Sequence, residues 1–182
     1  MDTLIPAALP SVPERLPTVQ EVWGWLADVA DPEIPVISVT ELGIVRDVAL
    51  DDAPGGPVCV VTVTPTYSGC PATAVISRSI EDALAARGVP RVRLDLRLSP
   101  AWTTDWITPE GRAKLKDYGI APPGSAAVEI SGLSRRRDEP PVECPRCGSA
   151  RTRLVSRFGS TPCKALHQCM DCREPFDHFK SH

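Results

Sequence analysis

Two Cys-x-x-Cys pairs near the C-terminus constrain this chain more than any other feature. The segment CPRCG contains Cys144 and Cys147, the segment CMDC contains Cys169 and Cys172, and 21 residues separate the pairs. Each short loop turns two sulfur atoms towards the same point, so two such loops can converge on one tetrahedral ion. We therefore predict a four-cysteine metal site. Zinc is favoured over iron because the second loop lacks the glycine of rubredoxin-type loops.

The module that carries this site, residues 143–182, is too small to order itself through an apolar core. Binding of structural zinc contributes on the order of 10 kcal/mol or more to the folding of such modules. Two redox-active Cys-x-x-Cys pairs are the alternative interpretation. His167, His178 and His182 could supplement the ligands, but the four cysteines are a complete set without them.

The number and placement of the cysteines also indicate the compartment. The chain has 182 residues and seven cysteines, an odd number, of which five follow residue 143. A disulfide framework across the whole fold is therefore not expected, and a reduced, cytoplasmic protein is. The start of the chain is unlike a signal peptide, and no stretch approaches the roughly 18 apolar residues of a membrane span.

Charge is divided unevenly along the chain. Residues 1–134 carry a net charge of −7 and residues 135–182 a net charge of +4. A nucleic-acid surface over the whole molecule is excluded, but a local basic patch on the tail is not. The tail has few aromatic residues for base stacking, and we expect them to form its own core. Nucleic-acid binding is therefore a minor alternative to an acidic protein partner.

Apolar periodicity predicts an α+β fold, with a small mixed sheet and helices on one face. A Thr-x-x-Glu capping box at Thr18 starts the first helix, and a hairpin with a loop of six to seven residues follows. The expected helices begin at residues 18, 71 and 109, and the expected strands are 44–50, 58–64, 91–98 and 127–130. The domain prediction is a flexible arm over 1–17, an α+β domain over 18–133, a linker over 134–142 and the four-cysteine ribbon over 143–182.

Three cysteines lie outside the predicted metal site, and each has a different interpretation. Cys70 precedes Pro71 and is predicted as the N-cap of the second helix, where the helix dipole favours a reactive thiolate; an indifferent buried cap is the alternative. Cys59 alternates with valines on one strand face and is predicted to lie in the core. Cys163, in FGSTPCK, is either a small buried residue or a free thiol used in transfer.

Asp31 and Glu33 flank Pro32 at the C-terminal end of the first helix. Acidic residues oppose the helix dipole at that end, so they need another role. On the residues alone we expect Asp31 or Glu33 to cap a turn, with a ligand role as the alternative. Trp102 and Trp106, four residues apart in SPAWTTDWIT, are expected to pack across the sheet.

Several segments together resemble a known family. DPEIPVISVTELGIVRDV, VTVTPTYSGCPA and SPAWTTDWIT are similar to the domain of SufT-type iron–sulfur maturation factors. With the CPRCG and CMDC ribbon and FGSTPCKALHQC added, the chain resembles the PaaD (PaaJ) family, the D subunits of bacterial 1,2-phenylacetyl-CoA epoxidase systems. The resemblance implies an accessory role in aerobic phenylacetate catabolism, in maturing the metal centres of the oxygenase and reductase subunits.

The resemblance also implies candidate site residues. The acidic motif of the family falls on Asp31, Pro32 and Glu33, and its reactive cysteine on Cys70; Cys163 also matches the family pattern. Iron or an iron–sulfur cluster would then be transient cargo, beside structural zinc. The expected partners are the oxygenase and reductase subunits, and homo-oligomers are left open.

Intrinsic catalysis is not expected. The chain has no histidine before His167, no paired Glu-x-x-His motif for a di-iron site and no phosphate-binding glycine loop. An assembly factor is the first hypothesis. A structural subunit of the epoxidase complex and a zinc-ribbon regulator that binds nucleic acid are the alternatives.

Overall fold

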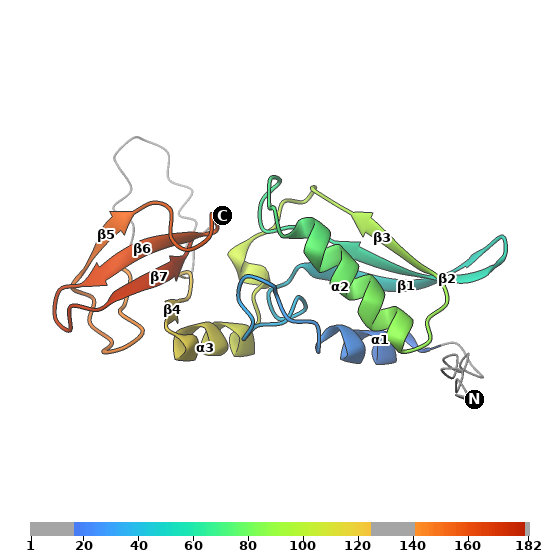
Figure 1. The fold of residues 1–182 in the computed structure, drawn as a ribbon, viewed down its shortest axis with the longest axis horizontal. Coiled ribbons are helices and arrows are strands. Elements are labelled where there is room, and N and C mark those ends of the chain that lie inside the picture. The colour runs from blue at the N-terminus through green and yellow to red at the C-terminus, as the bar shows by residue number, and fades with distance from the viewer. Residues whose placement is uncertain (1–16, 125–140, 181–182) are drawn as a thin grey trace, which may run out of the picture.

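A computed structural model describes residues 17–124 and 141–180 (Figure 1). The predicted strand 127–130 lies outside these ranges, as do nearly all of the predicted arm, 1–17, and linker, 134–142. In the described part of the chain, no helix has the length and apolar character that crossing a membrane requires.

The N-terminal half contains a three-stranded sheet in the order β1-β2-β3. Strands β1 (Val45–Ala53) and β2 (Gly56–Val63) form an antiparallel hairpin, and β3 (Val92–Leu96) runs parallel to β2. Helices α1 (Val19–Leu26) and α2 (Thr73–Ala86) share one apolar core with the sheet face that contains Cys59 and Val61. Cys59 is buried as predicted.

The helix ends follow the capping signals. Thr18 and Glu21 form the predicted capping box of α1. Helix α3 (Pro109–Tyr118) has Thr108 as its N-cap, and the Thr108 hydroxyl accepts a hydrogen bond from the Gly111 N–H; Gly119 is its C-cap. Gly119 has a φ of +94°, the left-handed conformation that glycine adopts without a Cβ penalty. A short 3-10 turn, η1 (Thr104–Trp106), precedes α3.

Two details of this half differ from the prediction. The hairpin turn is shorter than six residues because Ala53 already pairs with Gly56, and the positive φ of Gly55, +90°, allows the tight reversal. The predicted strand 91–98 is also too long, because β3 spans Val92–Leu96 and Leu98 beyond it is exposed.

The C-terminal half is a four-stranded sheet in the order β4-β7-β6-β5. It contains β5 (Thr152–Ser156), β6 (Lys164–Cys169) and β7 (Pro175–Phe179), to which β4 (Ile120–Ala121) adds in parallel. Strand β4 directly follows α3, so the N-terminal half supplies the last strand of this sheet (Figure 1). The predicted class, α+β with a ribbon-like C-terminal module, is confirmed.

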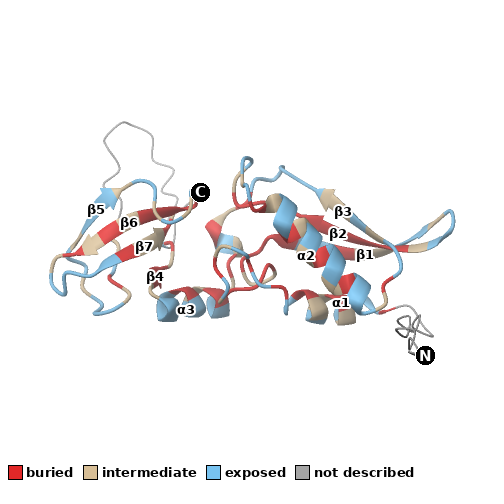
Figure 2. Ribbon diagram, viewed as in Figure 1, coloured by how far each residue is buried: buried red, intermediate tan, exposed pale blue. Residues whose placement is uncertain are grey.

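The two halves share more than a strand. Cys163 and Phe179, both from the ribbon, are buried within the same apolar cluster as α1, α2 and the front sheet. Figure 2 shows buried residues continuing from the sheet through the central loops to β6 and β7. The ribbon is thus built onto the front domain.

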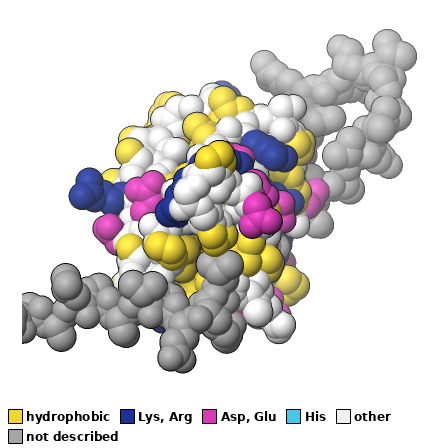
Figure 3. Space-filling view, turned by 90° about the vertical axis from the view of Figure 1, so that its right-hand side faces the viewer, with side chains coloured by type: hydrophobic (Ala, Val, Ile, Leu, Met, Phe, Trp, Pro, Cys, Tyr) yellow, Lys and Arg dark blue, Asp and Glu magenta, His cyan; other side chains and the backbone are white. Residues whose placement is uncertain are grey.

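At the end of the molecule opposite the ribbon, acidic and basic side chains are mixed on the surface (Figure 3).

Candidate functional site

The four ribbon cysteines form a compact cluster. Their sulfur atoms all lie within 4.8 Å of one another, with Cys144 Sγ 3.7 Å from Cys172 Sγ and Cys147 Sγ 3.6 Å from Cys169 Sγ. A tetrahedral ion with metal–sulfur bonds of about 2.3 Å places its sulfur ligands about 3.8 Å apart. The cluster therefore fits one four-coordinate metal ion, and among the described residues it alone brings three or more possible ligands this close.

Backbone groups prepare one of these sulfurs for a cation. The N–H of Cys172, helped by that of Asp171, lowers the pKa of the Cys169 thiol to about 6. The Glu174 N–H acts in the same direction on Cys172, but burial and the neighbouring sulfurs outweigh it and raise the pKa of Cys172. The cluster therefore holds one thiolate readily and resists several without a cation to balance them.

The histidines lie outside this cluster. His167 is buried on β6 and its ring stacks on Phe176, with 5.8 Å between centroids. His178 lies edge-on to His167 at 5.3 Å, and burial followed by the charge of His167 lowers the pKa of His178 to about 4. His182 is outside the described residues.

Asp31 caps the turn after α1, as the residues alone predict. Its Oδ1 accepts hydrogen bonds from the N–H of Glu33 at 2.9 Å and of Ile34 at 2.8 Å. The side chain is nevertheless buried, and this desolvation raises the pKa of Asp31. Desolvation, followed by the charge of Asp31, also raises the pKa of Glu33. The turn thus holds two carboxyl groups side by side in a partly water-excluded place.

Cys70 does not occupy the N-cap of α2, so that prediction is wrong. The helix begins at Thr73 and its N-cap is Ala72. The carbonyl of Cys70 accepts hydrogen bonds from the Thr73 N–H at 3.3 Å and from its hydroxyl at 2.9 Å. Pro71 sets the dihedral angle of the turn that these bonds close, and the turn precedes the helical ladder. The half-buried thiol therefore lies two residues ahead of the cap.

Cys163 directly precedes β6 and is 6% exposed. Its sulfur is 3.1 Å from the hydroxyl of Thr161. Burial raises the pKa of the Cys163 thiol, and the carboxylates of Glu33 and Asp31 act in the same direction. Lys164 opposes them with its positive charge. This cysteine is a core residue by burial and yet faces the electrostatic field of the acidic turn.

Three segments far apart in sequence meet here. Ile34, next to Glu33, and Cys163 are buried in one apolar cluster, and Tyr67 and Cys70 pack against it. Burial and then the charges of Cys70, Cys163 and Glu33 raise the pKa of the Tyr67 phenol. We call Asp31, Glu33, Cys70 and Cys163, together with Tyr67 and Lys164, the interdomain group. Their ligand atoms do not form a compact set like that of the ribbon cysteines.

Sequence reasoning missed two members of the interdomain group. Tyr67 stands three residues before Cys70, and Lys164 directly follows Cys163. Adjacency to the candidate cysteines was the available signal. This adjacency could not show that Lys164 is buried, with only 4% of its surface exposed, which is unusual for a lysine.

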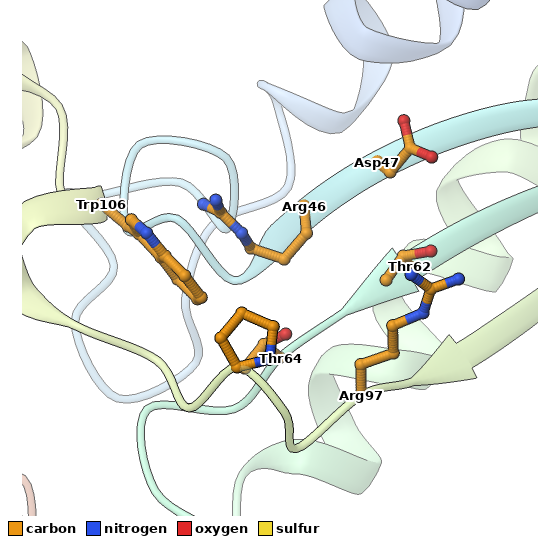
Figure 4. A pocket seen from close by; sticks show the side chains of 7 residues that line it. Arg46, Asp47, Thr62, Thr64, Arg97 and Trp106 are labelled. Atoms are coloured by element: carbon orange, nitrogen blue, oxygen red, sulfur yellow. The ribbon is translucent and has the colours of Figure 1, made fainter.

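The two tryptophans have separate places. Trp102 is buried, and its Nε1 donates a hydrogen bond to the Leu42 carbonyl at 3.0 Å. Trp106 lines a pocket of 190 Å³ beside the front sheet (Figure 4). In this pocket, the Arg46 guanidinium lies 3.5 Å from the centroid of the Trp106 ring. Arg97 reaches towards Thr62 on the far side of that pocket. None of the interdomain group lines it.

Comparisons with known proteins match both halves. Residues 19–101 match the family described as an iron–sulfur cluster assembly protein, and residues 130–180 match the PaaD zinc beta ribbon domain. The chain is 49% identical over 165 residues to the putative D subunit of the 1,2-phenylacetyl-CoA epoxidase of Escherichia coli, covering 90% of this chain and 93% of that protein.

More distant relatives cover the front half. An "Fe-S protein maturation auxiliary factor" of Porphyromonas gingivalis is 33% identical over 103 residues, which is 56% of this chain and 94% of that protein. A solved domain of unknown function from Bacillus anthracis is 24% identical, with a TM-score of 0.48 over 53% of this chain and 90% of that one.

Proposed function

This chain belongs to the PaaD family, and from that premise we propose that it is an accessory protein of a phenylacetyl-CoA epoxidase system. Its work is to assist assembly of iron or iron–sulfur centres in the oxygenase or reductase subunits. One observation carries the proposal: the ribbon, docked on the front domain, buries Cys163 in the same apolar cluster as Ile34 of the acidic turn, and Cys70 packs against that cluster.

The two cysteines are suited to different parts of such a task. Cys70 is half-buried at the surface end of a tight turn, where a partner can reach it. Cys163 is buried and held by Thr161, so it offers a thiol that water and oxidants reach poorly. Cargo iron would exchange thiolate ligands between this chain and its client. The exchange requires no redox step by the protein.

In the ribbon, we propose structural zinc. Four cysteines at tetrahedral distances leave no open position for a reacting molecule, which is the pattern of structural sites. The residues that would hold the ion are Cys144, Cys147, Cys169 and Cys172. The ion would stabilise the β5–β6–β7 sheet and, through it, the placement of Cys163.

Replacement of Cys70 by serine tests the transfer role. We expect Cys70→Ser to fold with wild-type circular dichroism, while epoxidase produced with it contains less iron or less cluster. Cys59→Ser is the matched control, because Cys59 is a core cysteine outside the interdomain group. Client metal content that is equal for the Cys70→Ser and wild-type proteins would overturn the proposal.

A structural subunit is the second candidate, and one observation favours it. Leu154, Val155 and Phe158 of the ribbon are exposed at 49%, 52% and 69%. Large apolar side chains exposed on one small module are typical of protein contacts. Copurification at a fixed ratio with active epoxidase supports this role, whereas epoxidase that keeps full activity after the chain is removed supports an assembly factor.

A further inference from the structure

We propose that the pocket beside the front sheet (Figure 4) binds a phosphate group, which the side chains of Arg46, Arg97, Thr62 and Thr64 hold. No member of the interdomain group lines this pocket, so the inference does not rest on the proposed function. The volume of the pocket, 190 Å³, is below the roughly 300–1,000 Å³ of most metabolite sites. It therefore suits a small anion or one group of a larger molecule.

A β-bulge places Arg46 at the pocket. The register of β1 on β2 shifts between Val45 and Asp47, so the intervening Arg46 is an extra residue without a partner on β2. A bulge re-aims the side chains of its strand, and here Arg46 and its neighbour Asp47 both line the pocket. The contact of the Arg46 guanidinium with the Trp106 ring, at 3.5 Å from the centroid, holds the positive charge in place.

Two threonines form the floor of the pocket on the open face of the sheet. Val61 and Val63 belong to the core that the sheet shares with α1 and α2. Thr62 and Thr64 alternate with these valines and therefore point to the opposite face. They are 5% and 3% exposed, yet neither hydroxyl makes a hydrogen bond within the described ranges. Buried hydroxyls have partners in folded proteins, so the contents of the pocket must supply them.

Backbone hydrogen bonds fix the two flanks of the pocket. Arg97 directly follows β3, and its N–H donates to the Val63 carbonyl at 2.9 Å, which keeps Arg97 beside the end of β2. On the other flank, the Thr64 N–H donates to the Ile44 carbonyl at 2.8 Å. The segments that carry the four side chains are thus joined by sheet hydrogen bonds, so the site is preformed.

The guanidinium groups of the pocket have no counter-ion. Among the described residues, the side chains of Arg46 and Arg97 form no ion pair and no hydrogen bond. Arg93 of the same sheet differs, because it pairs with Asp51 at 3.3 Å and with Asp95 at 3.1 Å. Each guanidinium offers five N–H donors. The pocket therefore presents a surplus of donors to a ligand rich in acceptors.

Asp47 is the acidic side chain of the lining, and it leaves the charge of the pocket positive. Two guanidiniums and one carboxylate give a net charge of +1. The Asp47 carboxylate lies at the rim and points away from Thr64 (Figure 4). An anion that contacts both guanidiniums forms charge-assisted hydrogen bonds, which are about twice as strong as neutral ones. Asp47 weakens this binding without preventing it.

Phosphate matches this set of donors better than a carboxylate does. A guanidinium contacts either group through two parallel hydrogen bonds, but a carboxylate has only two oxygens, which lie in one plane. A phosphate monoester has three acceptor oxygens and a charge of about −1.5 to −2 at pH 7. One oxygen can accept from a threonine hydroxyl while the others contact the arginines. Donors from separate segments therefore favour a tetrahedral anion.

The test is isothermal titration calorimetry of the full-length protein with inorganic phosphate and with adenosine monophosphate. We expect a dissociation constant between about 10 µM and 1 mM for inorganic phosphate, because so few atoms limit its affinity. Arg97→Gln and Arg46→Gln should each weaken the binding of both probes about 10-fold, since each removes a charged donor. Arg93→Gln is the matched control and should bind as the wild type does, because Arg93 does not line the pocket.

Two further variants test the hydroxyl and the sign of the charge effect. Thr64→Val keeps the shape of the side chain and should weaken phosphate binding about 3-fold to 10-fold. Asp47→Asn removes a repelling charge and should tighten binding about 2-fold. Arg97 is exposed, so Arg97→Gln should keep the circular dichroism of the wild type and decides the test if Arg46→Gln folds poorly.

The probes also separate the sources of the phosphate. Inorganic phosphate bound at least as tightly as adenosine monophosphate supports a site for the free anion, whereas tighter binding of adenosine monophosphate supports a phosphate carried by a larger molecule. Acetate bound as tightly as phosphate would indicate a carboxylate of an acidic partner protein and overturn the inference. No binding at about 10 mM phosphate, or binding that Arg97→Gln leaves unchanged, would overturn it as well.

Discussion

The indole ring of Trp102 and the phenyl ring of Phe179 pack against each other with 5.8 Å between centroids and a tilt of 48°. Trp102 belongs to the loop after the front sheet, and Phe179 ends the last strand of the ribbon. Phe179 is fully buried, so this contact joins the two halves through a common core rather than at a surface. Cys163 directly precedes β6, whose first residue, Lys164, pairs with Phe179, so the position of Cys163 depends on this packing.

Truncation of Phe179 should therefore destabilise the whole molecule. We expect Phe179→Ala to lower the free energy of unfolding by about 3–5 kcal/mol, the usual cost of removing a buried phenyl ring. Phe158→Ala is the matched control: Phe158 is 69% exposed in the same ribbon, and its loss should change stability by less than about 0.5 kcal/mol. Urea unfolding followed by tryptophan fluorescence measures both. Equal effects of the two changes would show that the halves are not coupled through this contact.

Local signals predict the elements that local interactions determine. The capping box at Thr18, the α3 start at Thr108 and the stop at Gly119 each depend on residues within one turn, so their positions are readable from sequence. The spacing of the ribbon cysteines is equally local within each pair. In contrast, the sequence misplaces Cys70 on the helix cap because a turn and a first helical turn share the same proline signal.

Contacts between distant segments are not predictable from the residues alone. Strand β4 has two residues and gives no strand pattern, and it exists because β7 offers it a pairing edge. The burial of Cys163 and Lys164 depends on how the ribbon docks. A single sequence contains no information on that docking, which is why it leaves two interpretations for Cys163 and gives no sign of Lys164.

The ribbon should contain about one zinc ion per chain and release it in acid. Zinc binds the deprotonated thiols, so protonation of the four cysteines competes with the metal increasingly as the pH falls. Burial and the neighbouring sulfurs raise the pKa of Cys172, so protons already compete for that ligand near neutral pH. Cys169→Ser should abolish stoichiometric zinc binding, which elemental analysis measures. It should also expose Phe179, which the fluorescence of the neighbouring Trp102 reports. Cys59→Ser should retain the ion. A chain that holds only labile iron after anaerobic purification would contradict the assignment.

Asp31 should make stability depend on pH in an unusual direction. Its pKa is raised in the folded state by burial, so the folded protein binds the proton more tightly than the unfolded chain does. The contribution of Asp31 to the free energy of unfolding is therefore largest at low pH. It decreases as the pH rises from about 4, the pKa of an unfolded aspartate, through the raised pKa of the folded state. In Asp31→Asn this decrease should shrink, with a remainder from Glu33, whose pKa is also raised.

Asp31→Ala is the companion variant. It removes the oxygen that accepts from Glu33 and Ile34, so it should cost about 1–3 kcal/mol at every pH. Urea unfolding at a series of pH values separates the two effects. If the free energy of unfolding of Asp31→Asn changes with pH by as much as that of the wild type, Asp31 is not the source of the pH dependence.

Gly43 should not tolerate a side chain, whereas Gly24 should. Gly43 has a φ of +72°, and a Cβ there would lie 2.6 Å from the Trp106 carbonyl oxygen and 2.7 Å from its Cβ. We expect Gly43→Ala to destabilise by about 1–3 kcal/mol, through backbone strain and overpacking. Gly24, inside α1, has nothing within 4 Å of the added atom, so Gly24→Ala should stabilise by about 0.4–1 kcal/mol. Thermal unfolding of the two variants measures both effects. A Gly43→Ala protein as stable as the wild type would contradict the prediction and would mean that Trp106 can move away from this turn.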